Sequence, residues 1–218
     1  MRAGRSPGPI VARATRIAPA GICLDTRMTD LTATAPCPCV LCDPAASATF
    51  RARRQRGKQW GSVMAHVQEY GWHVVGVGGG GDVPDWAFTV GLWHSHRIPE
   101  IAMFGLEVHG LMHWIGDAAT LLRGGAPREP GSLLPDVIED YQLRIQPVDD
   151  SWFRALFGTA GGFYRRTPVP FLQLVWPDRE HRWPADEQAS QGCRAQPDLQ
   201  LPVGRHPQGV WTEEAAWQ

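Results

Sequence analysis

Residues 86–106 limit the possible folds of this chain more than any other stretch. Bulky and small side chains alternate from Trp86 to Leu92, which is the period of a β-strand. A polar stretch follows, and Pro99 precedes a second apolar run at residues 101–105. The pattern predicts two strands joined by a polar loop over residues 93–99.

Helical and strand periods also recur on both sides of this stretch. Apolar residues at helical spacing predict helices over residues 58–70 and 107–123, the first with Trp60, Val63, Met64, Val67 and Tyr70 on its buried face. Gly71 is a natural stop for the first helix. A third helix is expected from Trp152 to about Phe163, capped by Asp150 or Ser151. Further strands are expected at residues 72–77, 137–141, 143–148 and 170–176.

This order of elements predicts an α+β fold rather than a regular βαβ series. We expect a mainly antiparallel sheet covered by two to three helices, with a barrel-like sheet as the alternative. The glycine run at residues 78–81 lacks the lysine and hydroxyl of a phosphate-binding loop, so it is interpreted as the hairpin joining 72–77 to 85–92.

Composition and charge bound the domain organisation and the function classes. The net charge of −1 argues against nucleic-acid binding, and no apolar run approaches the roughly 18 residues of a membrane span. Residues 1–35 are expected to be a disordered basic arm, or partly an over-extended start before Met28. Residues 36–185 are expected to form one α+β domain, and residues 186–218 an extended, proline-rich tail.

Cysteines gather in a C-x-C-x-x-C cluster formed by Cys37, Cys39 and Cys42. Thiolates so close in sequence can converge on one soft metal ion such as zinc, with a fourth ligand from Cys193 or a histidine. Reactive thiols and merely structural thiols are the open alternatives. The layout suits a disulfide framework poorly, so a reducing cytoplasm is predicted.

The second candidate site is the loop after the first strand of residues 86–106. Thr89, His94 and Glu100 could place a hydroxyl, an imidazole and a carboxylate around one pocket, a set that suits general acid–base catalysis. In the competing interpretation Glu100 pairs with Arg97 or caps backbone donors. The two functional hypotheses are therefore an enzyme or small-molecule-binding protein, and a protein-interaction or regulatory module that is either zinc-stabilised or metal-free.

Three blocks of sequence together carry a resemblance to a known family. They are the C-x-C-x-x-C start, the core from Gly71-Trp-His-Val-Val through Trp86-Ala-Phe-Thr-Val-Gly-Leu-Trp-His94 to Phe104-Gly-Leu106, and Leu172-Gln-Leu-Val-Trp-Pro-Asp178. In these blocks the chain resembles a bacterial family, the domain-of-unknown-function family 4262, over about residues 36–185. The resemblance implies a single α+β domain and a loop of the form His-x-x-x-x-Pro-Glu, matched by His94 to Glu100. It implies no reaction, and the second histidine, His96, departs from the pattern.

Overall fold

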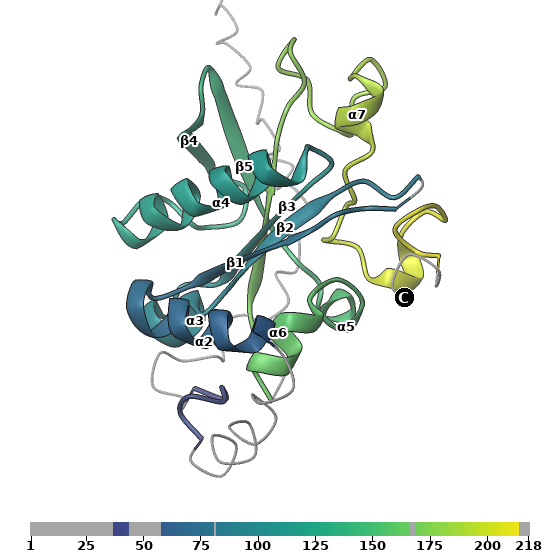
Figure 1. Ribbon diagram of the computed structural model, residues 1–218. Coiled ribbons are helices and arrows are strands. Elements are labelled where there is room, and N and C mark those ends of the chain that lie inside the picture. The colour runs from purple at the N-terminus through teal and green to yellow at the C-terminus, as the bar shows by residue number, and fades with distance from the viewer. Residues whose placement is uncertain (1–36, 44–57, 81, 166–168, 214–218) are drawn as a thin grey trace, which may run out of the picture. The chain divides into compact units, whose positions relative to one another are not determined.

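The computed structural model describes residues 37–43, 58–80, 82–165 and 169–213, which belong to one compact unit (Figure 1). The expected basic arm over residues 1–35 and the alternative start at Met28 lie outside the described residues. None of the described helices is both long and apolar enough to cross a bilayer.

A six-stranded mixed sheet forms the centre of the unit. Its strands lie in the order β1-β2-β3-β6-β5-β4, with bounds β1 His73–Val77, β2 Trp86–Val90, β3 Glu100–Phe104, β6 Phe171–Val175, β5 Tyr141–Pro147 and β4 Leu133–Ile138. Only β3 and β6 pair in parallel among these strands, and the other pairs are antiparallel. Because β1 and β4 are opposite edges of one linear order, the sheet is open, and the barrel-like alternative is wrong.

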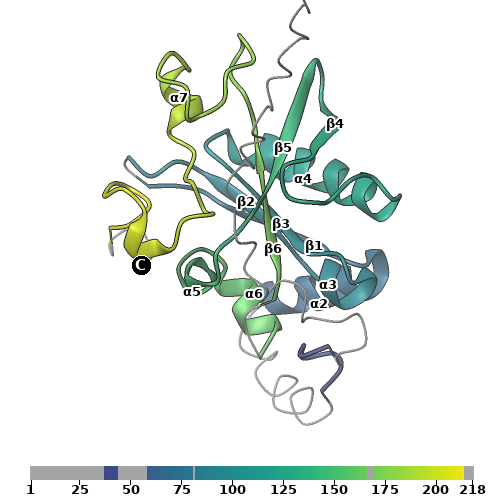
Figure 2. The ribbon, with the colours of Figure 1, turned by 180° about the vertical axis from the view of Figure 1, so that it is seen from behind.

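Helices cover both faces of this sheet (Figures 1 and 2). One face packs against α4, Val108–Arg123, and the other against α2, Lys58–Tyr70, and α6, Gly158–Phe163. The remaining helical elements are short: α3 Leu92–His96, η2 Asp150–Trp152, α5 Phe153–Leu156, α7 Gln191–Arg194 and η3 Val203–Arg205. The α+β class is thus confirmed.

The alternation along β2 divides its side chains between two cores. Trp86 and Phe88 belong to the aromatic core beneath α2 and α6, whereas Ala87 belongs to the aliphatic core beneath α4. All five β2 residues are buried because helices cover both sides of the sheet. The face of β2 that carries Ala87 is therefore the one that α4 covers.

Helix α2 forms as predicted, with one correction to its buried face. It ends at Tyr70, and Gly71 follows with a φ of 95°, a left-handed value that favours glycine. Tyr70, which the sequence pattern placed on the apolar stripe, is instead 56% exposed. Helix α4 also forms as predicted, and the Glu107 carboxylate caps it by accepting from the backbone N–H groups of His109 and Gly110.

The predictions for two elements and for the loop at residues 93–99 differ from the structure in their bounds or conformation. The strand expected at residues 137–141 spans a turn, because Asp140 adopts a φ of 64° between the paired residues Ile138 and Tyr141. The helix expected from Trp152 to Phe163 is interrupted at Phe157, which separates α5 from α6. The polar loop contains the helical turn α3.

The carboxyl-terminal segment also differs from the extended tail expected over residues 186–218. Leu199, Cys193 and Trp211 are buried, and Trp211 donates its indole N–H to the Ala195 carbonyl oxygen at 2.7 Å. The Gln173 amide on β6 donates to the Pro197 carbonyl oxygen at 2.8 Å. As far as residue 213, this segment is part of the packed structure, because its few apolar residues cover the end of the aromatic core.

Candidate metal centre

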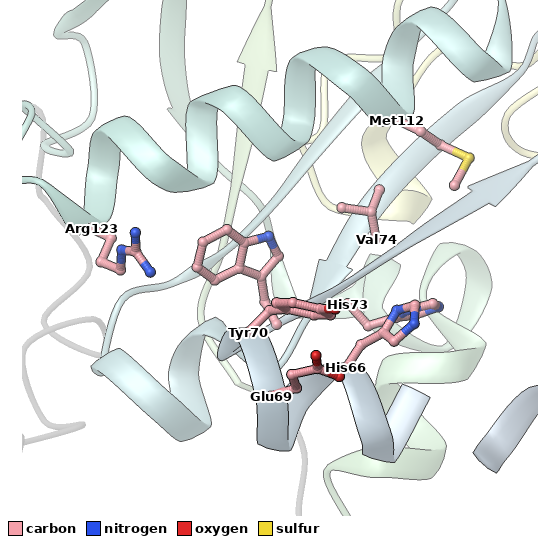
Figure 3. Close-up of a pocket in the computed structure, with 8 residues that line it drawn as sticks. His66, Glu69, Tyr70, His73, Val74, Met112 and Arg123 are labelled. Carbon is pink, nitrogen blue, oxygen red and sulfur yellow. The ribbon is translucent and has the colours of Figure 1, made fainter. Parts of the chain in front are cut away.

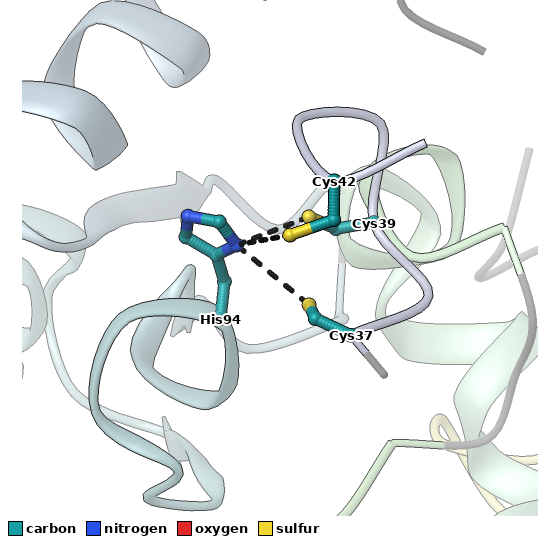
Figure 4. Close-up of side chains that lie close together, drawn as sticks. All are labelled: Cys37, Cys39, Cys42 and His94. Carbon is teal, nitrogen blue, oxygen red and sulfur yellow. Dashed lines mark hydrogen bonds between the residues drawn. The ribbon is translucent and has the colours of Figure 1, made fainter. Parts of the chain in front are cut away.

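Four side chains from two distant parts of the sequence converge at one point (Figure 4). Cys37, Cys39 and Cys42 surround the His94 imidazole, and the four potential ligand atoms all lie within 4.8 Å of one another. The Sγ atoms of the three cysteines lie 3.7, 3.1 and 3.4 Å from His94 Nδ1. These residues could hold one metal ion.

The distances suit a tetrahedral ion better than a set of hydrogen bonds. A ring nitrogen carries either one proton or one lone pair, so His94 Nδ1 cannot bond fully with three sulfurs at once. With metal–sulfur and metal–nitrogen bonds of about 2.3 and 2.05 Å, a tetrahedral ion holds its sulfur and nitrogen ligands about 3.6 Å apart. The three observed separations bracket that value.

Backbone contacts hold the cysteine segment in place. Cys39 forms an isolated antiparallel bridge with Tyr164, and Val40 N–H donates to the Phe163 carbonyl oxygen at 3.0 Å. Val40 is fully buried in the aromatic core. Cys42 N–H and Asp43 N–H both donate to the Cys39 carbonyl oxygen, which folds the segment into a turn and brings the thiols together.

Helix α3 supplies the histidine, and a glycine permits the turn that starts it. Gly91 has a φ of 114°, and a Cβ at this position would lie 2.7 Å from Val67 Cγ2. Only glycine combines this left-handed conformation with so close an approach to α2. The chain therefore leaves β2, turns at once into α3 and presents His94 to the cysteine segment.

The Glu100 carboxylate anchors the start of α3 from beneath. Its Oε1 accepts hydrogen bonds from the backbone N–H groups of Gly91 at 2.9 Å and Trp93 at 3.1 Å. Its Oε2 accepts from the Thr89 hydroxyl at 2.6 Å, and Thr89 Oγ1 accepts in turn from Ile101 N–H. Glu100 is thus the cap of the helical turn that carries His94.

Tyr164 connects this network to the backbone of His94, one of the four candidate ligands. Its hydroxyl donates to Glu100 Oε1 and accepts from the backbone N–H of His94 at 3.2 Å. Burial raises the pKa of Glu100, although the hydrogen bonds from Thr89 and Tyr164 oppose the shift. Burial and the neighbouring carboxylate raise the pKa of Tyr164 well above its usual value, so its hydroxyl stays protonated as the donor.

Cys37 and Cys39 change the pKa values of their neighbouring thiols. The hydrogen bond from Cys39 and the contact with His94 lower the pKa of Cys37 to about 4, against burial, which raises it. The hydrogen bond to Cys37 and burial raise the pKa of Cys39, and burial raises that of Cys42. Ionising more than one thiol places negative charges side by side, and a divalent cation at the centre would offset that repulsion.

The structure separates the residues that the sequence grouped into one catalytic pocket. Thr89 and Glu100 are fully buried beneath α3, whereas the His94 ring is half-buried and faces the cysteines. Glu100 therefore caps backbone donors, as the competing interpretation held, rather than pairing with Arg97. The catalytic roles assigned to Thr89, His94 and Glu100 stay a prediction.

The remaining candidate ligands lie elsewhere. Cys193 is buried beside the Trp176 carbonyl oxygen, so the fourth position near the cluster belongs to His94 and not to Cys193. His109 contacts Glu107 and His113 contacts Asp117 on the exposed side of α4. The sequence analysis missed Tyr164, because a lone tyrosine in an apolar stretch gives no signal of its hydrogen-bond partners.

Comparison with known proteins yields one match. The family model described as Domain of unknown function (DUF4262) matches residues 66–190, more than half of the chain. No curated protein and no solved structure matches. The matched region contains His94, Glu100 and Tyr164, whereas the three cysteines precede it.

Proposed function

This chain belongs to the DUF4262 family, and we propose that it is a zinc-binding member whose metal has a structural role. In this proposal Cys37, Cys39, Cys42 and His94 are the four ligands, and zinc fastens residues 37–43 to helix α3. In its zinc-bound form the domain acts as a protein-interaction or regulatory module.

The observation that carries the proposal is the placement of three sulfurs around one imidazole nitrogen. Thiolate and imidazole ligands in tetrahedral positions are the set that zinc prefers in structural sites. The candidate ligand His94 is also held in position by neighbouring residues. Tyr164 and Glu100 accept hydrogen bonds from the backbone N–H groups of α3. A cytoplasmic location, which would keep the thiols reduced, stays a prediction.

The number of ligands favours a structural role over a catalytic one. Catalytic zinc sites keep one position open for water or substrate, whereas structural sites are closed by four protein ligands. Here four protein ligands are available at one point. A closed site supports the interaction or regulatory function more than the enzymatic one.

Elemental analysis of untagged protein purified with zinc in the medium tests this site directly. We expect one zinc per chain in the parent protein and a large loss of zinc in Cys42→Ser, a change at an exposed ligand. The matched control is Cys193→Ala, which removes a thiol outside the cluster and should keep the full zinc content. A zinc content well below one equivalent in the parent would exclude the proposal.

A second candidate function, small-molecule binding, is favoured by a pocket away from the metal centre. It has a volume of about 460 Å³ and lies between α4, the β4–β5 hairpin and the segment after β6. Aromatic and aliphatic side chains line much of it, including Trp114, Tyr141, Trp176 and Leu106. Pockets of this size and lining are typical of sites for small, partly apolar ligands.

A fluorescent apolar anion, anilinonaphthalene sulfonate, is a suitable probe for this pocket. We expect saturable binding that is about tenfold weaker in Trp114→Ala and in Tyr141→Ala, because each change removes an aromatic wall. The control is Met112→Ala, which lies on the same helix but lines a different pocket. Equal binding by all four proteins would place the dye elsewhere and remove the support for this function.

A further inference from the structure

Two histidines outside the metal centre face each other across the junction between α2 and β1. His66 lies on the exposed side of α2, and His73 is the first residue of β1. Their Nδ1 atoms are 2.8 Å apart, and the ring centroids are 4.9 Å apart. Figure 3 shows both rings on one wall of a surface pocket of about 610 Å³, with Arg123 and Met112 on the side of α4.

Local structure is sufficient to create this pair. Gly71 accepts the left-handed conformation that ends α2, and its N–H donates to the Val67 carbonyl oxygen at 3.1 Å. The chain then reverses into β1, which brings residue 73 back beside residue 66. The two imidazoles are therefore fixed by a helix end and an adjacent strand rather than by a long loop.

The separation of the two nitrogens matches the geometry of a chelated ion. Two imidazole nitrogens bound at about 2.05 Å lie about 2.9 Å apart in neighbouring positions of a square-planar or octahedral ion. Around a tetrahedral ion the same bonds would place them about 3.3 Å apart. The observed 2.8 Å is nearer to the first value, and in the metal-free pair it is also the length of one N–H···N hydrogen bond.

We propose that His66 and His73 form a second metal site, in which the two Nδ1 atoms bind one Ni²⁺- or Cu²⁺-like divalent ion. The other coordination positions face the pocket and are filled by water or by an exogenous ligand. The site shares no residue with the cysteine cluster, so it functions whether or not zinc occupies that cluster.

Titration of the zinc-loaded protein with Ni²⁺ tests the proposal. Ni²⁺ is chosen over Cu²⁺ because it does not oxidise the thiols. Isothermal titration calorimetry should show one Ni²⁺ bound per chain, while elemental analysis shows that the zinc stays bound. His66→Gln and His73→Gln should each weaken Ni²⁺ binding by at least about tenfold, since each removes a ligand. His66 is exposed on a helix, so its replacement by glutamine leaves the fold intact.

The control removes a different histidine pair, His109 and His113, which lie four residues apart on α4. The double variant His109→Gln, His113→Gln lies on the exposed side of α4 and should bind Ni²⁺ as the parent does. If the parent binds no Ni²⁺, or if His66→Gln binds it as tightly as the parent, the two imidazoles share only a hydrogen bond and the proposal is wrong.

Discussion

Removal of zinc is expected to lower the free energy of unfolding by about 4 kcal/mol, relative to protein in a buffer whose free zinc is about 1,000 times the dissociation constant. The reason is that Cys37, Cys39 and Cys42 meet His94 only in the folded chain, so binding energy is folding energy. For a chain of this size the change corresponds to a fall of about 8–16 °C in the melting temperature. Thermal unfolding in zinc buffer and in chelator measures it.

The variant Cys39→Ser provides the control for this experiment. Cys39 is fully buried and lies nearest to His94, so its loss should abolish zinc-dependent stabilisation. The variant should melt at one temperature with or without zinc, near that of the chelator-treated parent. Equal melting temperatures for the parent in both buffers would contradict a structural zinc site.

Replacement of Glu100 by alanine is expected to cost about 3–5 kcal/mol of stability. The carboxylate is fully buried and accepts from the backbone N–H groups of Gly91 and Trp93 and from the hydroxyls of Thr89 and Tyr164. Alanine removes the acceptor that these donors share, and only Gly91 N–H keeps a second acceptor, the Tyr164 hydroxyl at 3.1 Å. The cost of a buried donor without a partner is about 1–3 kcal/mol. Urea denaturation, with its slope compared between variants, measures the change.

A matched control compares the stability cost of losing the buried Glu100 carboxylate with that of losing an exposed helix cap. Glu107→Ala removes the carboxylate that caps α4 at the surface and should cost only about 1 kcal/mol. A similar small cost for Glu100→Ala would show that the buried network contributes little.

A milder change at the same network tests whether it positions the metal ligand. Tyr164→Phe keeps the ring in the aromatic core and removes the hydroxyl that joins Glu100 to the backbone of His94. We expect zinc affinity to fall by about tenfold, measured by competition with a chelator, while the protein remains folded. Unchanged zinc affinity would assign Tyr164 and Glu100 to stability alone.

The sequence by itself determined the elements with strong local signals. The apolar period and Gly71 determined α2, and the alternation from Trp86 to Leu92 determined β2 and the two faces of the sheet. The spacing of Cys37, Cys39 and Cys42 offered a metal site as one of three interpretations of the thiols. These features depend on residues only a few positions apart, which is why they can be predicted without knowledge of the fold.

Only the tertiary structure decided which distant residues these local elements contact. His94 is 55 residues from Cys39, and Tyr164 is 64 residues from Glu100, so neither pairing has a sequence signal. His94 and Glu100, which the sequence placed in one pocket, have different surroundings: the imidazole faces the cysteines, and the buried carboxylate accepts from backbone N–H groups at the start of α3. Contacts between distant residues depend on how the sheet and its covering helices pack, and packing is a property of the whole chain.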